Sequence, residues 1–313
     1  MDICPKNQTI CDNIIRAWSI INNPKHNKIL CSISGGSDSD IMLDIVWKCD
    51  CYNKVDYVWF DTGIEYQATK NHLKYLENRY RITIQRHKPK KTVPLSCEQY
   101  GLPFHSKYTS EMISRLQKHG FQWEDGSFAE LIQKYPGCQS ALQWWCRDKL
   151  SPSLNITKKL KQFIIINPPK FNISSNCCKF AKKNVAHDIV KQGNYDLSII
   201  GIRKAEGGIR SFKYKNCYDE IEEGCNVYRP IFWYTDSDKT EYKKHFNIMY
   251  SDCYTVYGLK RTGCVGCPFS SKFEEELEVV KIYEPKLYKA VVNIFKESYE
   301  YMREYRNFKK RNE

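Results

Sequence analysis

Residues 32–39 read Ser32-Ile33-Ser34-Gly35-Gly36-Ser37-Asp38-Ser39, and they separate an apolar β-type run from the helical pattern of residues 40–49. Gly35 and Gly36 allow the backbone to turn tightly and to approach a ligand. The hydroxyls of Ser34, Ser37 and Ser39 add polar groups, and the start of the helix supplies free N–H groups and a positive dipole. The stretch therefore predicts a loop that binds phosphate or pyrophosphate. The alternative is a Ser/Gly turn that only caps a helix.

Short β-rich runs alternate with longer amphipathic stretches along the chain, which predicts an α/β fold with a parallel sheet between helices. The runs that we interpret as strands are Lys28–Ile33, Val55–Phe60, Ile82–Gln85, Phe163–Ile166 and Leu197–Ile200. The expected domains are a nucleotide-binding core of residues 1–91 and 161–230, a helical insertion of residues 92–160, and a C-terminal cysteine-loop and helical region of residues 231–313. The role of the insertion stays open.

The composition is that of a globular protein, because 42% of the 313 residues are hydrophobic and 14% are aromatic. The chain does not begin with a basic and then apolar leader. Its longest apolar runs, such as residues 163–167, are far shorter than the roughly 20 residues of a membrane span. The sequence therefore predicts a cytoplasmic protein with no membrane partner.

The formal net charge of +13 is unevenly distributed. Eight lysines and no acidic residue lie between Asp148 and Asp188, and six Lys or Arg residues and no acid lie between Glu77 and Glu98. Such segments attract anions, so tRNA or DNA is a candidate partner. A highly charged nucleotide, or an ordinary solvated surface, accounts for the same charges.

Two further motifs follow β-type runs. The first is Asp61-Thr62-Gly63, which comes after Val55–Phe60, at the strand end where open α/β sheets bind ligands. The second follows Leu197–Ile200 and contains Gly201, Arg203, Glu206 and Arg210. Its two guanidinium groups are suited to phosphate or sulfate oxygens. A helix cap and a surface salt-bridge loop are the respective alternatives.

Two cysteine pairs indicate a metal centre. Cys177-Cys178 precedes Cys264-Val-Gly-Cys267, whose glycines allow two thiolates to converge on one ion. Fifteen cysteines in a reducing compartment are not expected to form a disulfide framework. Four thiolates suit a 4Fe-4S cluster, with zinc as the alternative metal. Buried cysteines without a ligand and a redox-active C-x-x-C pair stay open as well.

The loop Ser34–Ser39 matches S-G-G-x-D-S and so resembles the PP-loop of the ATP pyrophosphatases and of the phosphoadenosine phosphosulfate (PAPS) reductase family. The other two motifs resemble that family's D-T-G and G-x-R-x-x-E-S-x-x-R elements, and the cysteine arrangement resembles that of the iron–sulfur adenylylsulfate (APS) reductases. The resemblance implies a Rossmann-like adenine nucleotide alpha hydrolase fold. Many relatives have Lys where this chain has Ser37, so one phosphate charge must be met elsewhere.

The nucleotide-binding residues that the resemblance implies are Ser34, Gly35, Gly36, Ser37, Asp38, Ser39, Asp61, Thr62, Gly63, Gly201, Arg203, Glu206 and Arg210. Asp38, Asp61 and Arg203 are the candidate catalytic residues, the first two for magnesium or nucleotide positioning and the third as an anion clamp. Cys177, Cys178, Cys264 and Cys267 are the candidate ligands of the cluster. The implied cofactors are ATP, Mg²⁺ and the 4Fe-4S cluster.

The end of the chain separates two branches of this family. APS and PAPS reductases attack the sulfate sulfur with a cysteine near the C-terminus, and the last cysteine here is Cys267. The chain is therefore more similar to the tRNA-thiolating enzymes and the DNA phosphorothioation sulfurtransferases. The hypothesis is an ATP-dependent sulfurtransferase whose sulfur donor is a protein such as a cysteine desulfurase. The alternatives are an APS or PAPS reductase that uses thioredoxin, and a non-catalytic nucleic-acid-binding module.

Overall fold

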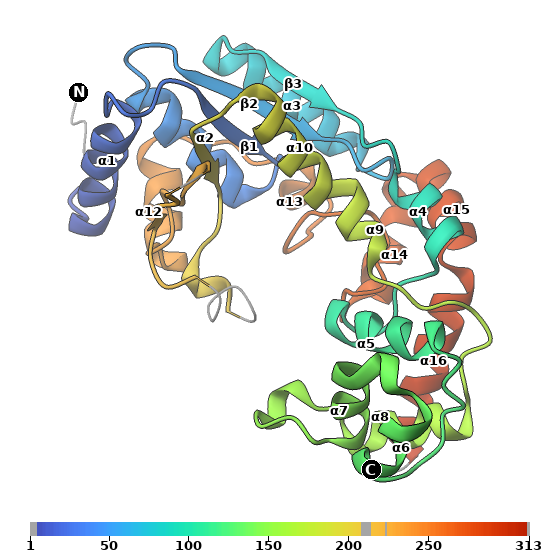
Figure 1. Ribbon diagram of the computed structural model, residues 1–313. Coiled ribbons are helices and arrows are strands. Elements are labelled where there is room, and N and C mark those ends of the chain that lie inside the picture. The colour runs from blue at the N-terminus through green and yellow to red at the C-terminus, as the bar shows by residue number, and fades with distance from the viewer. Residues whose placement is uncertain (1–4, 208–213, 223, 312–313) are drawn as a thin grey trace. The chain divides into compact units, whose positions relative to one another are not determined.

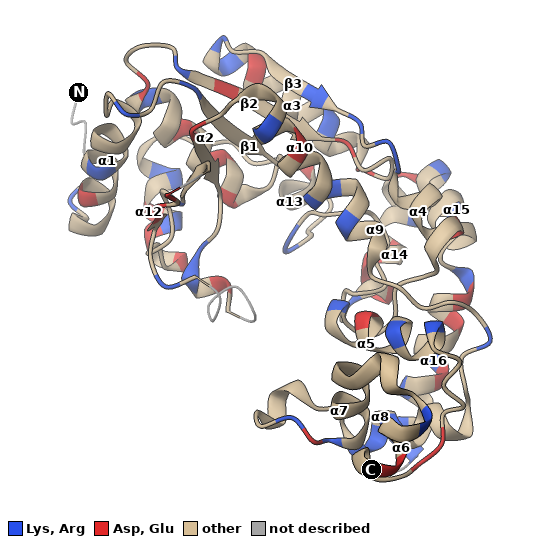
Figure 2. Cartoon of the chain, viewed as in Figure 1, with Lys and Arg blue, Asp and Glu red and all other residues tan. Residues whose placement is uncertain are grey.

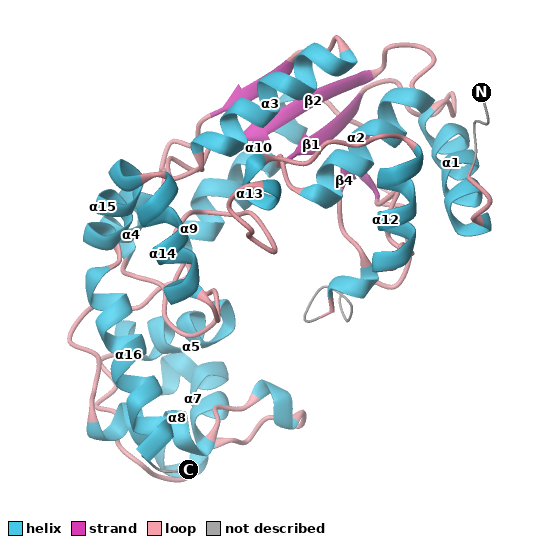
Figure 3. Cartoon of the chain, turned by 180° about the vertical axis from the view of Figure 1, so that it is seen from behind, coloured by secondary structure: helices cyan, strands magenta, loops and turns pink. Residues whose placement is uncertain are grey.

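The computed structural model describes residues 5–207, 214–222 and 224–311, and the chain divides into two compact units (Figure 1). The first unit consists of Met1–Pro89 and Lys182–Gly263, and the second of Lys90–Ala181 and Cys264–Glu313. The strands lie in the first unit, whereas the second is built from helices (Figure 3). This confirms the predicted α/β class.

A six-stranded sheet in the order β3-β2-β1-β4-β6-β5 forms the centre of the first unit. Its strands are β1 Ile29–Ile33, β2 Val55–Phe60, β3 Ile84–His87, β4 Leu197–Ile200, β5 Tyr218–Asp219 and β6 Asn226–Tyr228. All neighbours pair in parallel except β5 and β6, which are antiparallel. The carboxyl ends of β1, β2 and β4 therefore meet at one edge of the sheet, where the three predicted nucleotide motifs begin.

Strand β1 is buried on both faces, which explains its continuous apolar run. Ile29, Cys31 and Ile33 belong to the larger core cluster on one side of the sheet. Leu30 belongs to a second cluster with Val58 and Tyr195 on the other side. The strand is therefore central, and the loop that follows it leaves from the middle of the sheet.

Helices cover both faces of this sheet. The helices of the first unit are α1 Gln8–Ile21, α2 Ser37–Cys49, α3 Gln67–Tyr80, α10 Asn184–Gly193, α12 Asp236–His245 and α13 Asp252–Thr255. Helices α1, α2 and α3 contribute to the larger core cluster, and α10 packs against the smaller one. Because α2 is almost entirely buried, its N-terminus is held firmly at the carboxyl edge of β1.

The second unit is a helical assembly with an aromatic core. Its helices are α4 Val93–Tyr100, α5 Lys107–Lys118, α6 Phe128–Lys134, α7 Gln139–Cys146, α8 Lys158–Ile166, α9 Asn176–Cys178, α14 Phe273–Tyr283, α15 Pro285–Ile294 and α16 Lys296–Arg311. Tyr301 of α16 lies with its ring centroid 4.7 Å from that of Phe104 and 5.0 Å from that of Phe163. The aromatic C-terminal helix therefore packs as part of this core.

The predicted strand Phe163–Ile166 is wrong, because these residues end helix α8. The Thr157 hydroxyl caps that helix by accepting a hydrogen bond from the Leu160 amide at 3.3 Å. Leu160, Phe163 and Ile164 are buried with helical spacing, whereas Ile166 is exposed. A short apolar run does not distinguish a strand from a buried helix segment, and here the cap and the spacing decide.

The two units differ from the three expected domains, because residues 264–313 form one unit with the helical insertion and two further segments change place. Residues 161–181 belong to the second unit with the helical insertion, and residues 231–263 belong to the first unit with the sheet. Helix α12 accounts for the second difference, because its Tyr242 hydroxyl donates a 2.6 Å hydrogen bond to the buried Asp44 carboxylate of α2. The segment after β6 therefore completes the unit that contains the sheet.

Charged residues occur throughout both units, with Lys and Arg interspersed among Asp and Glu (Figure 2). Among the described residues, no helix combines the length and apolar character needed to cross a membrane.

Candidate nucleotide site and cysteine cluster

The predicted phosphate loop joins β1 to α2. Ser34, Gly35 and Gly36 connect Ile33 of the strand to Ser37, the first residue of the helix. Gly35 has a φ of +66°, and a Cβ atom added to it would lie 2.9 Å from the Thr69 Cγ2 atom. A side chain at this position is therefore opposed by both backbone conformation and space.

The serines of the loop accept hydrogen bonds from backbone amides. The Ser34 amide donates to the Ser39 hydroxyl at 2.9 Å, and the Gly36 amide donates to the Ser34 hydroxyl at 3.3 Å. The Ser37 amide donates to the Tyr254 hydroxyl at 3.1 Å. These bonds hold the loop in shape at the N-terminus of α2, where the helix dipole favours anions.

Asp38 is the centre of an ion-pair group. Its Oδ1 atom lies 3.1 Å from Nε of Arg203 and 2.5 Å from Nζ of Lys239. Arg203 also places Nη1 2.9 Å from an oxygen of Asp236. The guanidinium group of Arg203 therefore meets two carboxylates, and its predicted role as a phosphate clamp stays a prediction.

The loop after β4 packs on the first turn of α2. A Cβ atom added to Gly201 would lie 3.4 Å from Cα of Ser39, so the two loops are in contact. Glu206 accepts a 3.2 Å hydrogen bond from the backbone amide of Arg203 and so fixes this turn. Arg210 lies outside the described residues.

Asp61 is buried at the end of β2, as expected. Its Oδ1 atom accepts a 2.9 Å hydrogen bond from the Gly63 amide, and its Oδ2 atom forms an ion pair with Arg86 of β3. Burial alone raises the pKa of Asp61, but these two partners outweigh it, so that the pKa is lowered. Thr62 donates a 2.6 Å hydrogen bond to Glu65, which orders the same turn.

Three residues near the loop were not predicted from the sequence: Lys239, Tyr254 and Thr262. Lys239 Nζ donates a 2.6 Å hydrogen bond to the Ser37 hydroxyl. A Cβ atom on Gly36 would lie 3.0 Å from the Thr262 Oγ1 atom and 3.3 Å from the Tyr254 hydroxyl, so both side chains border the loop. They come from segments without a motif, and the only available signal was the unmet charge at Ser37.

The predicted cysteine pairs gather in the second unit. Cys177 is buried in α9, and its thiol interacts with those of Cys178 and of Cys97 in α4. The contact with Cys178 lowers the pKa of Cys177, but the contact with Cys97 and burial together raise it. Burial raises the pKa of Cys267 to about 12, and this thiol interacts electrostatically with Cys264 and Cys178. Five thiols therefore form one group, and Cys97 is the member that sequence spacing did not reveal.

The turn of the C-x-x-C pair is fixed by α16. Gly266 has a φ of +61°, and its carbonyl oxygen accepts a hydrogen bond from the buried hydroxyl of Tyr299. A Cβ atom at Gly266 would lie only 2.5 Å from that hydroxyl oxygen. The Tyr299 ring stacks on Phe273 of α14 with centroids 5.1 Å apart. The glycine is therefore required by the packing of the cysteine loop.

The chemical type of the donor atoms in the cysteine group suits a thiophilic metal centre. All of these donors are thiols, and cysteine thiolates are the ligands of iron–sulfur clusters. Over residues 5–207, 214–222 and 224–311, however, no three His, Cys, Asp or Glu side chains are placed so that they could hold a metal ion. Assignment of a cluster to these residues is therefore a proposal.

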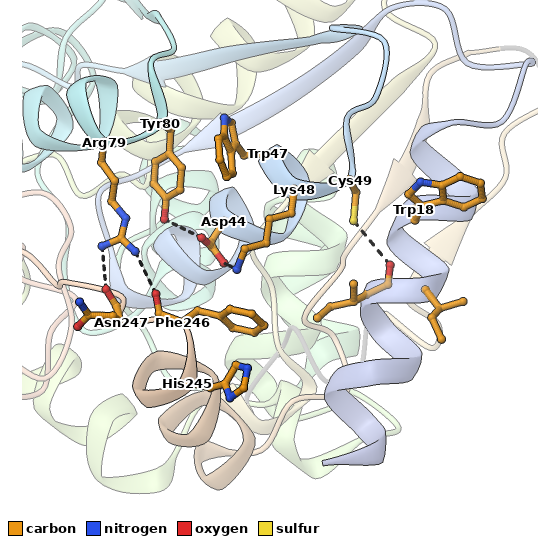
Figure 4. A pocket seen from close by; sticks show the side chains of 12 residues that line it. Trp18, Asp44, Trp47, Lys48, Cys49, Arg79, Tyr80, His245, Phe246 and Asn247 are labelled. Carbon is orange, nitrogen blue, oxygen red and sulfur yellow. Dashed lines mark hydrogen bonds and ion pairs between the residues drawn. The ribbon is translucent and has the colours of Figure 1, made fainter. Parts of the chain in front are cut away.

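A separate hollow of about 850 Å³ lies at the other end of α2 (Figure 4). Its wall includes Trp18 and Trp47, and Lys48 points to the Asp44 carboxylate inside it at 2.5 Å. None of the twelve residues drawn in Figure 4 belongs to the nucleotide motifs. This hollow is therefore separate from the candidate nucleotide site.

The fold and the loop together define an α/β protein with a glycine- and serine-containing loop at the carboxyl edge of a parallel sheet. Residues 28–122 match the family model described as the phosphoadenosine phosphosulfate reductase domain. The resemblance to the PAPS reductase family is thereby confirmed for this part of the chain. The match includes the loop of residues 34–39 and the Asp61-Thr62-Gly63 turn.

A relative that matches most of the chain has low sequence identity to it. An uncharacterized protein of Methanocaldococcus jannaschii is 26% identical over 300 residues, which are 93% of this chain and 47% of the relative. The chain thus spans about half the length of this curated relative.

Solved structures resemble the chain at low identity. A phosphoadenylyl-sulfate reductase from Candida auris is 14% identical with a TM-score of 0.42, covering 83% of this chain and 89% of that one. A U34-tRNA thiolase from Methanococcus maripaludis, solved with its [4Fe-4S] cluster, is 11% identical with a TM-score of 0.40, covering 95% and 79%. Neither likeness assigns a reaction to this chain.

Proposed function

We propose that this protein is an ATP-dependent sulfur-transfer enzyme that activates its substrate by adenylation at the PP-loop and uses a 4Fe-4S cluster. The observation that carries the proposal is the ion-pair group at the loop, where Asp38 meets Arg203 and Lys239 beside the N-terminus of α2. Such a group combines two cations and a carboxylate within the reach of the loop amides. These are the groups that a triphosphate and its Mg²⁺ ion require.

In the proposed reaction, an oxygen atom of the substrate attacks the α-phosphorus of ATP. The bond between the α-phosphorus and the bridging oxygen breaks, and pyrophosphate leaves. The loop amides and the cations at Asp38 stabilise the negative charge that develops on the phosphates. Hydrosulfide then attacks the activated carbon or phosphorus centre and releases AMP, so that sulfur replaces the original oxygen.

Cys177, Cys178, Cys264 and Cys267 would hold the cluster. When bound, the cluster supplies a site that binds and delivers sulfur. The contribution of the chain is to keep the thiols near one another, for which Tyr299 fixes the turn at Gly266. Asp38 would bind Mg²⁺, because a carboxylate at the loop is its preferred type of ligand. Asp61, Arg203 and the other residues of the nucleotide motifs would position the nucleotide.

Nucleic acid, as tRNA or DNA, is the acceptor class that we favour, because of the net charge of +13 and the acid-free segment between Asp148 and Asp188. A small-molecule acceptor is the second class. A cysteine desulfurase would serve as sulfur donor, and free sulfide replaces it in the first test.

The test is an anaerobic reaction of the purified protein with ATP, Mg²⁺, sulfide and either unmodified tRNA or DNA fragments. The proposal predicts pyrophosphate release together with sulfur in the nucleic acid, detected by mass spectrometry of the digested nucleosides or nucleotides. Formation of sulfite from APS or PAPS with thioredoxin would instead indicate a reductase. Nucleic-acid binding without ATP turnover would indicate a binding module.

A further inference from the structure

The PP-loop of this chain lacks a cation at the position where many relatives have Lys, because Ser37 occupies it. A triphosphate carries several negative charges, and the loss of one charge-assisted hydrogen bond weakens its binding. The structure supplies a cation at the same place from a different element. Lys239 of α12 directs its ammonium group to Ser37 itself, at 2.6 Å from the hydroxyl oxygen.

The ammonium group of Lys239 is held at the start of α2. Its Nζ atom lies 2.5 Å from Oδ1 of Asp38, and its side chain is 18% exposed. It therefore lies at the loop and still reaches solvent. A phosphate oxygen bound at the loop amides would therefore lie close to the positive charge of Lys239 beside residue 37, although residue 37 itself is a serine.

Helix α12 is fixed well enough to make this placement specific. The Thr235 hydroxyl and the Asp238 carboxylate cap its N-terminus reciprocally. Asn7 donates a 2.8 Å hydrogen bond to Asp238, and Tyr242 donates a 2.6 Å hydrogen bond to Asp44 of α2. Lys239 lies between Asp238 and Tyr242 in the sequence, so its position is fixed by a helix that is held at both of these residues.

We propose that Lys239 is the phosphate-binding lysine of this PP-loop and replaces, from α12, the lysine that Ser37 removes from the loop. In this arrangement Lys239 binds a nonbridging oxygen of the ATP β- or γ-phosphate. Asp38 then exchanges one of its two cationic partners for the Mg²⁺ ion and keeps Arg203. This inference rests on the proposed function, because it concerns the same nucleotide.

The test measures binding of ATP, pyrophosphate and adenosine by calorimetry at a fixed Mg²⁺ concentration. Lys239→Ala should weaken ATP and pyrophosphate binding by about tenfold or more, since a charge-assisted hydrogen bond is lost. Adenosine binding should stay within about twofold, because adenosine has no phosphate. Lys239→Gln keeps the length of the side chain but loses its charge, so it should show the same loss. Lys244→Ala, an exposed change on the same helix, is the matched control.

The deciding variant is the double substitution Ser37→Lys with Lys239→Ala, which moves the cation back into the loop. We expect it to recover ATP binding to within about threefold of the unsubstituted protein. If Lys239→Ala and Lys239→Gln bind ATP as the original protein does, or if Ser37→Lys recovers nothing, the inference is wrong. If the original protein binds neither ATP nor pyrophosphate, the proposed function fails and this inference fails with it.

Discussion

Arg203 Nε lies 3.1 Å from Oδ1 of Asp38, so the loop after β4 and the first turn of α2 are joined by an ion pair at the edge of the sheet. Arg203 is buried and also contacts Asp236, which begins α12. This arginine therefore connects three segments of the first unit. Its substitution is expected to affect both stability and nucleotide use.

Arg203→Ala should lower the free energy of unfolding by about 1–3 kcal/mol, because Asp38 loses a charged partner in a largely buried position. ATP turnover should fall by at least about tenfold. Arg203→Lys keeps the charge without the fork and should be intermediate. Urea unfolding and a turnover assay measure these effects. A stable and fully active Arg203→Ala variant would show that the ion pair is incidental.

Gly36→Val should prevent nucleotide binding without removing the fold. A Cβ atom at Gly36 already lies 3.0 Å from the Thr262 Oγ1 atom and 3.3 Å from the Ser34 hydroxyl, so a branched side chain displaces the loop. We expect at least a hundredfold weaker ATP binding in equilibrium measurements. Gly263→Ala is the control, because a Cβ atom there has no described neighbour within 4 Å. Unchanged ATP affinity in Gly36→Val would exclude the loop as the phosphate site.

Serine substitution of Cys264 or Cys267 should remove iron and acid-labile sulfide from protein purified without oxygen. Serine is a poor replacement for a thiolate ligand of iron. Cys97→Ser tests the limits of the group, since Cys97 contacts Cys177 but belongs to neither pair. We expect it to retain about four irons per chain, as should Cys138→Ser, a buried cysteine of the same unit. A colourless original protein that binds one zinc would contradict the cluster.

His26 should make the protein less stable in mild acid. Burial lowers the pKa of His26, despite the Asp196 carboxylate 3.5 Å away, below the ordinary value of 6.5. The unfolded chain therefore takes up a proton on this residue more readily than the native one, and stability falls as the pH drops below about 6.5. Urea unfolding at pH 7.5 and 5.5 measures the change, which should shrink in His26→Gln.

His187 supplies the control for this pH effect, because its side chain is exposed. His187→Gln should leave the difference between pH 7.5 and 5.5 unaltered. A pH dependence that is identical in His26→Gln and in the original protein would assign it to other groups.

The central part of the fold follows from the sequence for a physical reason. Strands β1, β2 and β4 are apolar runs that end in loops with turn residues, and a parallel sheet brings such ends to one edge. The local sequence pattern did not identify the secondary structure of residues 163–166, because an apolar run of this length suits a helix as well as a strand. The cap at Thr157 lies outside that run.

The sequence also indicated the loop and the cysteine pairs but not their partners. Lys239 and Cys97 reach their sites through the packing of α12 on α2 and of α4 near α9, which no spacing along the chain encodes. The missing lysine at Ser37 indicated that a cation must come from elsewhere, without identifying it. Contacts of this kind arise only from tertiary structure.

The most direct test of the account is to determine which bond of ATP the protein breaks. ATP labelled at the α-phosphate is incubated with the protein, Mg²⁺, sulfide and mixed tRNA and DNA, and the nucleotide products are separated. The account predicts labelled AMP and an equal amount of pyrophosphate, both lost in Gly36→Val. Labelled ADP with free phosphate, or turnover that survives Gly36→Val, would contradict adenylation at the PP-loop.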